Sequence, residues 1–235
     1  MIRTRTDADV RVVTIDRPEA RNALRPADLT SLREAFEPPE TDGHPPVTFL
    51  RGAGEAFCAG ADLDAVAALD DPAAFARRGQ RVAAAIEESP SVVVCGVDGA
   101  ARGGGVELAL AADVRVATPR ATLAEPGVSL GLFGAWGGTV RLPRVMGEGE
   151  ALDFALSGRV LDAAAARRTG LVSRVVDDPR SVADEIAAGE ADALAAIKRR
   201  LRDRSDDETQ EAAEAAAFAD LHDAHADEIA RRRER

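Results

Sequence analysis

Residues 98–108, DGAARGGGVEL, join an apolar run at 92–97 to a second apolar run at 106–110. This order predicts a strand, a glycine turn and the beginning of a helix. The first N–H groups of a helix have no partner within it, and the helix dipole favours negative charge there. Because glycine has no Cβ, a ligand atom can come close to this backbone. The stretch therefore predicts a main-chain site for a negatively charged oxygen.

A second glycine-bearing stretch, FCAGADL at residues 57–63, lies earlier in the chain. N–H donors from two separate loops together form an oxyanion hole, which stabilises charge that develops on a carbonyl oxygen. A triple glycine alone is typical of a simple turn, and residues 57–63 alone are compatible with a loop that packs on the core. The combination of the two stretches favours an oxyanion hole.

Three further motifs accompany these two stretches. They are RPEARNAL at 17–24, GGT followed by RLPR at 137–144, and the segment from AA at 163–164 to GLVSRVV at 170–176. With all of them in family order, the chain resembles the crotonase (enoyl-CoA hydratase/isomerase) superfamily. The resemblance implies a mixed α/β fold of ββα units wound into a superhelix, with C-terminal helices that build trimers. It predicts an acyl-CoA-binding core at 1–180 and a C-terminal helical oligomerisation region at 181–235, in a homotrimer or a dimer of trimers.

The resemblance also implies roles for residues of the two glycine stretches. The backbone N–H groups of Ala61 and Gly104 are expected to bind the acyl thioester oxygen, so both side chains need only be small. Glu107 is expected to be a catalytic glutamate beside the α and β carbons of the substrate. Arg21 is a candidate for binding the phosphates of coenzyme A. The neighbouring positions expected to bind substrate are Ala59, Gly60, Asp62 and Gly103.

The setting of Glu107 supports a functional role independently of the resemblance. It lies three residues beyond Gly104 on the expected helix, so both residues face the same side. The residues that follow, 108–112, are apolar and predict a helix that is buried all round. A buried carboxyl without a function would cost free energy. The alternative is a solvated glutamate in the first turn of a helix, which the dipole would also favour.

A second carboxylate is missing from its usual place. Family hydratases carry Pro-Glu where this chain has Pro126-Gly127, but a glutamate occurs two residues before Gly127, at Glu125. If residues 122–127 are extended, positions 125 and 127 point to one face. Glu125 would then reach the same pocket and act as a second acid. The alternative is that Glu125 only shapes the pocket.

These residues predict an enoyl-CoA hydratase that adds water across a 2-enoyl-CoA. Two alternatives stay open: an enoyl-CoA isomerase, which needs one glutamate, and an acyl-CoA-binding protein without coupled acid–base chemistry. The coenzyme A thioester is the substrate, and no metal or redox cofactor is expected. Imidazole catalysis is not supported, because His44 lies in a proline-rich loop and His222 and His225 lie in the last helix.

Charge sets further limits on function. The net charge is −11, with 41 acidic and 30 basic residues, and Lys198 is the single lysine. An acidic surplus of this kind favours adaptation to high salt, which screens repulsion between surface carboxylates. A bias towards arginine codons would explain the scarce lysine but not the acidic surplus.

Nucleic acid is not an expected partner, because an acidic protein repels it. No signal segment or membrane span is apparent, so the expected location is the cytoplasm.

Hydrophobic periodicity predicts the remaining elements. Strands are expected at 10–16, 47–50, 114–117 and 122–123, helices at 26–36 and from 72 onwards, and a loop at 37–46. The chain beyond Gly137 reads as mainly helical. Its last helix carries Phe218, Leu221 and Ile229 among acidic residues, which fits either a surface helix or a helix that docks on another subunit.

Overall fold

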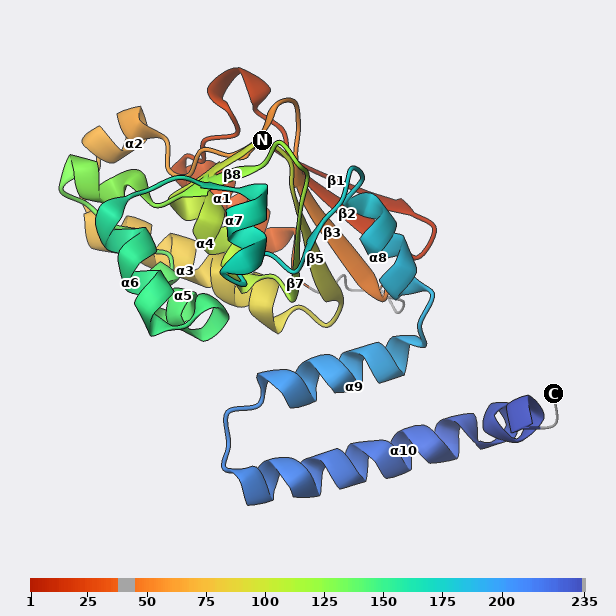
Figure 1. Ribbon diagram of the computed structural model, residues 1–235. Coiled ribbons are helices and arrows are strands. Elements are labelled where there is room, and N and C mark those ends of the chain that lie inside the picture. Colours follow the sequence, from red (N-terminus) through yellow and green to blue (C-terminus); the bar gives the residue numbers. More distant parts are fainter. Residues whose placement is uncertain (38–44, 234–235) are drawn as a thin grey trace.

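The computed structural model describes residues 1–37 and 45–233, and a sheet of six described strands forms one layer of its body (Figure 1). The strands lie in the order β1 (Ile2–Asp7), β2 (Val10–Ile15), β3 (Val47–Gly52), β5 (Val92–Val97), β7 (Val114–Ala117) and β10 (Arg174–Val175). β1 pairs antiparallel with β2, and the other pairs are parallel.

A second, smaller sheet contains β4 (Ala56–Cys58), β6 (Ala100–Arg102), β8 (Thr122–Ala124) and β9 (Leu161–Asp162). The chain alternates between the two sheets, so that β3, β5 and β7 of the large sheet are followed by β4, β6 and β8 of the small one. Each such pair leads into helical structure: α2 (Leu63–Ala67) and α3 (Pro72–Glu88), then α4 (Gly104–Ala111), then α5 (Gly138–Met146). This repeated ββα order confirms the predicted superhelix.

Helix α4 lies at the centre of the body, and all eight of its residues are buried. Its apolar side chains join a core shared with α1 (Pro26–Glu34), α3, α6 (Glu148–Ser157) and α7 (Ala163–Arg168). Helix α8 (Arg180–Ala187) packs Val182 and Ala183 in a second cluster with residues of the large sheet, including Phe49 and Val94. The N-terminus of α4 is therefore held from several sides.

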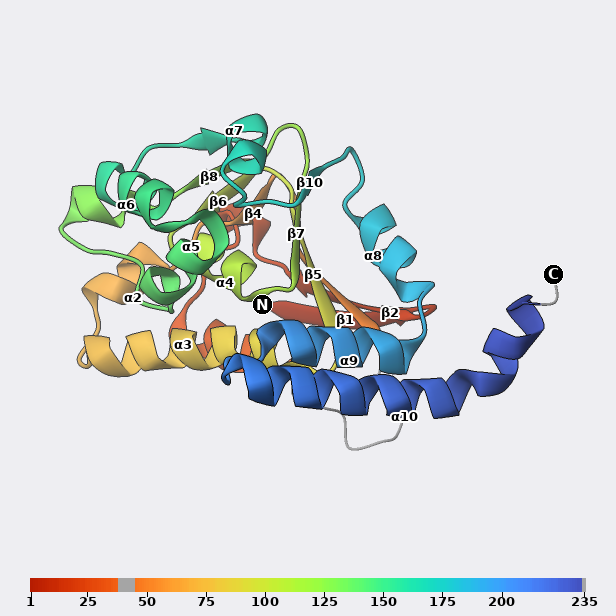
Figure 2. The ribbon, with the colours of Figure 1, turned by 60° about the horizontal axis from the view of Figure 1, so that its bottom comes forward.

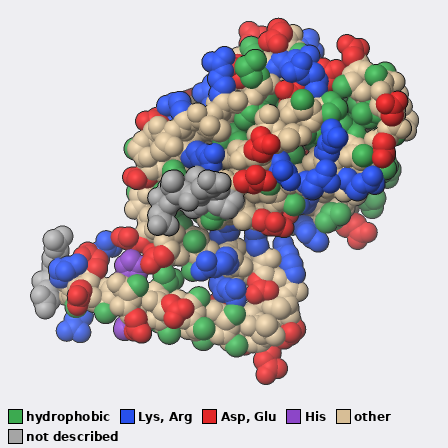
Figure 3. All heavy atoms as spheres, turned by 180° about the vertical axis from the view of Figure 1, so that it is seen from behind, with side chains coloured by type: hydrophobic (Ala, Val, Ile, Leu, Met, Phe, Trp, Pro, Cys, Tyr) green, Lys and Arg blue, Asp and Glu red, His purple; other side chains and the backbone are tan. Residues whose placement is uncertain are grey.

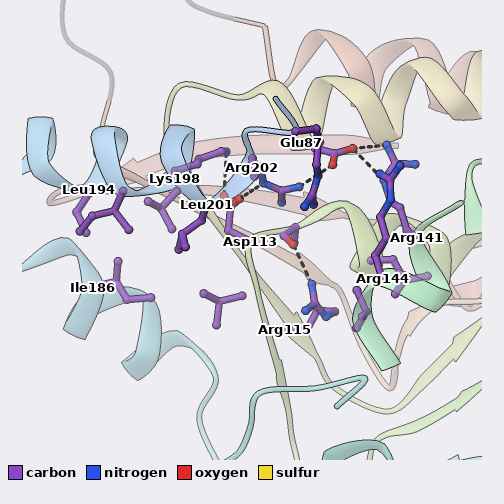
Figure 4. Close-up of a pocket in the computed structure, with 17 residues that line it drawn as sticks. Glu87, Asp113, Arg115, Arg141, Arg144, Ile186, Leu194, Lys198, Leu201 and Arg202 are labelled. Carbon is purple, nitrogen blue, oxygen red and sulfur yellow. Dashed lines mark hydrogen bonds and ion pairs between the residues drawn. The ribbon is translucent and has the colours of Figure 1, made fainter. Parts of the chain in front are cut away.

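The C-terminal helices α9 (Ala191–Arg202) and α10 (Asp207–Arg233) run side by side and project from the body (Figures 1 and 2). Ion pairs attach α9 to the body: Arg202 reaches Glu87 and Asp113 at 2.7 Å each, and Lys198 reaches Asp113 at 2.8 Å (Figure 4). Seen from behind, the two helices stand off from the body across a hollow (Figure 3). None of the 27 residues of α10 is buried, and Phe218 is 71% exposed.

Three details differ from the sequence-based expectations. The strand that begins at residue 122 ends at Ala124, and a 3-10 helix, Pro126–Leu130, follows. The prediction that residues 122–127 are extended was therefore wrong. The strand β1 and the short β4 and β6 were not predicted. Most of the predicted loop at 37–46, with His44, lies outside the described residues. Over the residues described, no helix is both long and apolar enough to cross a membrane.

Candidate active site

Buried Asn22 fixes the loop that contains the first predicted donor. Its amide Nδ2 donates to the carbonyl oxygens of Ala53 at 2.9 Å and Ala56 at 2.7 Å. The Asn22 backbone adopts a left-handed conformation with φ of 59°, which asparagine tolerates better than most residues. The side chain, with no exposed surface, thus ties the RPEARNAL segment to β4.

Backbone hydrogen bonds on either side of Ala61 leave its own N–H group free. The Leu24 N–H donates to the Gly60 oxygen at 2.8 Å, and the Asp62 N–H donates to the Leu24 oxygen at 3.0 Å. Within the described residues the Ala61 N–H donates to no protein acceptor. Ala61 lines a cavity, so this N–H group is available to a ligand there.

Gly103 and Gly104 form the second glycine turn at the cavity, which was predicted to supply the other oxyanion donor. Gly103 has φ of 47° and ψ of −118°, a conformation open to glycine, and its N–H donates to the Ala124 oxygen at 3.0 Å. Gly104 begins α4, and its N–H donates to no acceptor among the described residues. A Cβ built on Gly60 would lie 3.0 Å from the Gly104 nitrogen. The two loops are thus in contact, which brings the free N–H groups of Ala61 and Gly104 into one site.

Glu107 lies one turn further along α4 and is 1% exposed. Its Oε1 accepts hydrogen bonds from the backbone N–H groups of Trp136 at 2.7 Å and Gly138 at 2.6 Å. Burial raises the pKa of Glu107 to about 7, although these two hydrogen bonds favour the ionised form. Oε1 is thus held in place, while Oε2 has no hydrogen-bond partner among the described residues.

Glu125 faces the same cavity from the end of β8 and is 5% exposed. Neither of its carboxyl oxygens has a hydrogen-bond partner among the described residues. Burial, together with the negative charge of Glu107, raises the pKa of Glu125 to about 8. Glu125 lacks the N–H donors that Glu107 has, so it keeps its proton to higher pH.

Gly134 leaves the space between the two carboxyl groups open. A Cβ built on Gly134 would lie 3.0 Å from Oε2 of Glu107 and 3.0 Å from Oε2 of Glu125. Both oxygens therefore border the same small volume, next to the free N–H groups. Any side chain at position 134 would occupy that volume.

The cavity that joins these groups has a volume of about 270 Å³ and is mainly apolar. Helices α2 and α3 supply one wall, and the 3-10 helix with the loop after it supplies the other. The apolar lining consists of Leu63, Val66, Leu69, Pro72, Phe75, Ala76, Pro126, Leu130, Leu132, Phe133, Ala135 and Trp136. A few polar groups that converge in an apolar cavity are typical of a binding site for a small molecule.

Most of the residues predicted from sequence meet in this cavity. Its lining includes Ala59, Gly60, Ala61, Gly103, Gly104, Glu107 and Glu125. The Asp62 side chain instead caps α2 at the Ala65 N–H and pairs with Arg17 at 2.5 Å. Arg21 is exposed and does not line the cavity. Arg102, which directly precedes the triple glycine, donates to the backbone and hydroxyl oxygens of Thr122 at 2.7 and 3.0 Å.

Sequence reasoning missed the partners of Glu107. The GGT motif was recognised only as a glycine turn, whereas the Trp136 and Gly138 N–H groups before and within it hold the carboxylate. The sequence did contain a signal for these donors. Gly137 and Gly138 stand at the start of a helix, as the glycines of residues 98–108 do, and the first N–H groups of a helix have no partner within it. Among the described residues, no group of three His, Cys, Asp or Glu side chains is placed to hold a metal ion.

Comparisons with known proteins agree with this geometry. The enoyl-CoA hydratase/isomerase family matches residues 5–232. A Mycobacterium tuberculosis protein named "Probable enoyl-CoA hydratase EchA14" is 40% identical over 187 residues, which cover 79% of this chain and 73% of that protein. A Rhizobium meliloti protein named as a probable enoyl-CoA hydratase is 36% identical over 189 residues, covering 79% and 72% of the two chains.

Solved structures show the same fold. The enoyl-CoA hydratase of Bacillus anthracis aligns with a TM-score of 0.87 at 30% identity, covering 93% of this chain and 89% of that one. The enzyme of Thermoplasma volcanium aligns with a TM-score of 0.86 at 31% identity over 96% of both chains. A ββα superhelix that directs two free N–H groups and two carboxyls into one cavity defines a crotonase-type site. The chain belongs to the enoyl-CoA hydratase/isomerase family.

Proposed function

We propose that this chain is an enoyl-CoA hydratase that adds water across the double bond of a 2-enoyl-CoA. The observation that carries the proposal is the pair of buried carboxyls, Glu107 and Glu125, on either side of Gly134. Addition of water needs one group that accepts a proton and one that donates a proton. Glu107 has the lower pKa of the two and is therefore the proton acceptor, whereas Glu125 keeps its proton to higher pH and is the donor.

In the first step, Glu107 removes a proton from water as the water oxygen attacks the β carbon. The electrons of the double bond move towards the thioester carbonyl, whose oxygen gains negative charge. The N–H groups of Ala61 and Gly104 donate to this oxygen and stabilise it in a mainly apolar cavity.

In the second step, the α carbon takes a proton from Glu125 as the carbonyl is restored. Glu107 is then protonated and Glu125 ionised, so a proton must return from Glu107 to Glu125 before the next turnover. Both Oε2 atoms border the same volume beside Gly134, which makes transfer through one water a short path. The proposed reaction uses these two carboxyls and two N–H groups, with no resident metal or cofactor.

The first test is the product formed from defined acyl-CoA substrates. We expect loss of the conjugated 2-enoyl-CoA and appearance of the 3-hydroxyacyl-CoA, measured by absorbance and mass spectrometry. Conversion of a 3-enoyl-CoA to the 2-enoyl-CoA without hydration would identify an isomerase instead. Binding without turnover of either substrate would identify an acyl-CoA-binding protein and contradict the proposal.

We also propose that residues 181–235 mediate assembly into a homotrimer or a dimer of trimers. The exposed apolar side chains of α10, Phe218 at 71% and Ile229 at 51%, support this role. Arg21 remains a candidate contact for the phosphates of coenzyme A, and its exposure is compatible with that role. The cytoplasmic location and the absence of nucleic acid as a partner stay predictions of the sequence.

Assembly is expected to strengthen as salt concentration rises. With a net charge of −11, subunits repel one another at low ionic strength. The Debye length falls from about 30 Å at 0.01 M salt to about 3 Å at 1 M, whereas apolar attraction through Phe218 changes much less. Light scattering over a sodium chloride series measures this directly. Phe218→Ser should weaken assembly at every concentration, and Ala216→Ser on the same helix is the control. A mass that is constant from 0.01 M upwards would contradict a salt-adapted surface.

A further inference from the structure

The indole of Trp136 is wedged between two glycines of different helices. Trp136 is 3% exposed and lines the cavity beside Glu107. A Cβ built on Gly79 would lie 2.1 Å from the indole Cδ1, and one built on Gly104 would lie 2.2 Å from Cζ3. Either distance is far shorter than a van der Waals contact, so neither helix could carry a larger residue there with the ring in place.

Gly79 lies in the interior of the 17-residue helix α3, where glycine is an unfavourable residue. Glycine inside a helix costs about 1 kcal/mol relative to alanine. The contact with Trp136 explains why glycine is nevertheless present at this position, since any Cβ would collide with the indole. The indole also packs edge-to-face on Phe75, with ring centres 5.8 Å apart and planes at 69°. The two rings and the two glycines form one packed unit between α3 and α4.

This unit lies directly beside the oxyanion hole, because the six-membered ring of the indole covers Gly104. Trp136 lines the same cavity as Gly104 and Glu107, so an acyl group bound in that cavity would pack against the indole. Among the other large side chains of the cavity, Leu63 is 62%, Leu130 59% and Phe133 71% exposed, whereas Val66 and Leu69 are partly buried and pack on the core. Phe75 at 8% and Trp136 at 3% exposed are thus the two buried aromatic side chains of the cavity that contains the two carboxyls.

We propose that Trp136, backed by Phe75, closes the inner end of the acyl cavity and restricts the substrate to short acyl chains. This inference rests on the proposed function for its substrate class. The role of the side chain is separable from catalysis, because the Trp136 group that holds Glu107 is the backbone N–H. A substitution of the side chain keeps that donor while it opens space between α3 and α4.

The test is the ratio of kcat/KM for 2-decenoyl-CoA to that for 2-butenoyl-CoA, with the C6 and C8 substrates between them. In the native chain we expect kcat/KM to fall by at least about 10-fold from C4 to C10, since a single mismatched methylene in a pocket changes it by roughly 10–200-fold. Trp136→Ala should raise the C10:C4 ratio by at least about 10-fold, and Trp136→Leu should raise it less.

Phe154→Leu is the matched control, because Phe154 is a fully buried aromatic residue of α6 that does not line the cavity. It should leave the C10:C4 ratio unchanged even if it lowers stability. If Trp136→Ala fails to fold, Trp136→Leu carries the test alone. A native chain that prefers the C10 substrate, or a ratio that neither Trp136 variant alters by more than about threefold, overturns the inference.

A binding measurement separates this inference from the proposed reaction. Calorimetry with the saturated butyryl-CoA and decanoyl-CoA requires no turnover. Tighter binding of butyryl-CoA by the native chain, with the preference reduced about 10-fold or more in Trp136→Ala, supports the inference even if no hydration occurs. Equal affinities of the native chain for both ligands overturn it, even if hydration of 2-butenoyl-CoA confirms the proposed function.

Discussion

Glu107→Gln is expected to lower kcat by about 10²–10⁴, the usual effect of removing a general acid–base group. Glutamine has nearly the same shape, and its Oε1 can still accept hydrogen bonds from the Trp136 and Gly138 N–H groups that hold Glu107. The loop after Phe133 should therefore keep its position. The oxyanion donors belong to the backbone and are unchanged, so binding of acyl-CoA should persist.

Steady-state kinetics together with calorimetric binding of a saturated acyl-CoA measure the two expectations separately. Glu88→Gln is a matched control, because Glu88 is an exposed glutamate near the end of α3 and lies outside the cavity. It removes one carboxylate without touching the site and should leave kcat unchanged. Native turnover in Glu107→Gln would show that Glu107 is not the base.

The sequence alone was sufficient for the parts of the site that depend on local backbone geometry. The resemblance implied that Ala61 and Gly104 act through their N–H groups, and a strand, a glycine turn and a helix start follow each other between residues 92 and 108. Helical spacing then placed Glu107 beside Gly104. These predictions need no knowledge of distant contacts, and the structure brings the three residues to one cavity.

Elements and partners that depend on distant contacts could not be predicted in this way. The strand β1 has mostly exposed residues and is defined by its pairing with β2. Trp136 meets Gly79 of α3, far away in the chain, and no local pattern indicates this contact. Asp62 was expected to bind substrate, but an aspartate before a short helix also satisfies a free N–H at the helix start, and that local interaction prevailed.

Glu125 was chosen for a local reason that proved wrong. An extended backbone to residue 127 was expected to direct it, yet the strand ends at Ala124 and a 3-10 helix begins at Pro126. Glu125 lies at the junction, with φ of −107° and ψ of 74°. Its direction is set by this turn next to α4. A carboxyl so buried and unpaired is costly, which favours a role in the reaction over a role in packing.

Glu125→Gln provides a second large effect, because it removes the proposed proton donor. We expect hydration to fall by about 10²-fold or more. In the native chain, activity should rise as Glu107 ionises, with its pKa of about 7, and fall as Glu125 loses its proton, with its pKa of about 8. The Gln variant cannot lose that proton, so the residual activity should no longer fall at high pH. The pH profile of kcat/KM measures both limbs.

The same variant should become more stable than the native chain at high pH. Burial raises the pKa of Glu125 from 4.5 to about 8, so the folded state holds a proton that the unfolded chain releases between these values. The native chain therefore loses stability as pH rises through this range. Glutamine stays neutral, so the stability difference should grow by about 4 kcal/mol from pH 5 to pH 9, since each pKa unit corresponds to about 1.4 kcal/mol. Denaturant unfolding at both pH values measures it.

The two readouts together decide what Glu125 does. If it is the proton donor, Glu125→Gln loses hydration while its stability at pH 9 increases, a combination that a damaged fold cannot produce. If Glu107 alone moves the proton, hydration stays nearly native and only the stability changes. A Glu125 that only shapes the cavity would be replaced with little loss by the neutral and similarly shaped glutamine, so kcat and KM for 2-enoyl-CoA at neutral pH would stay nearly native. The pH dependence of kcat and of the free energy of unfolding, measured together, therefore determines whether Glu125 is the proton donor.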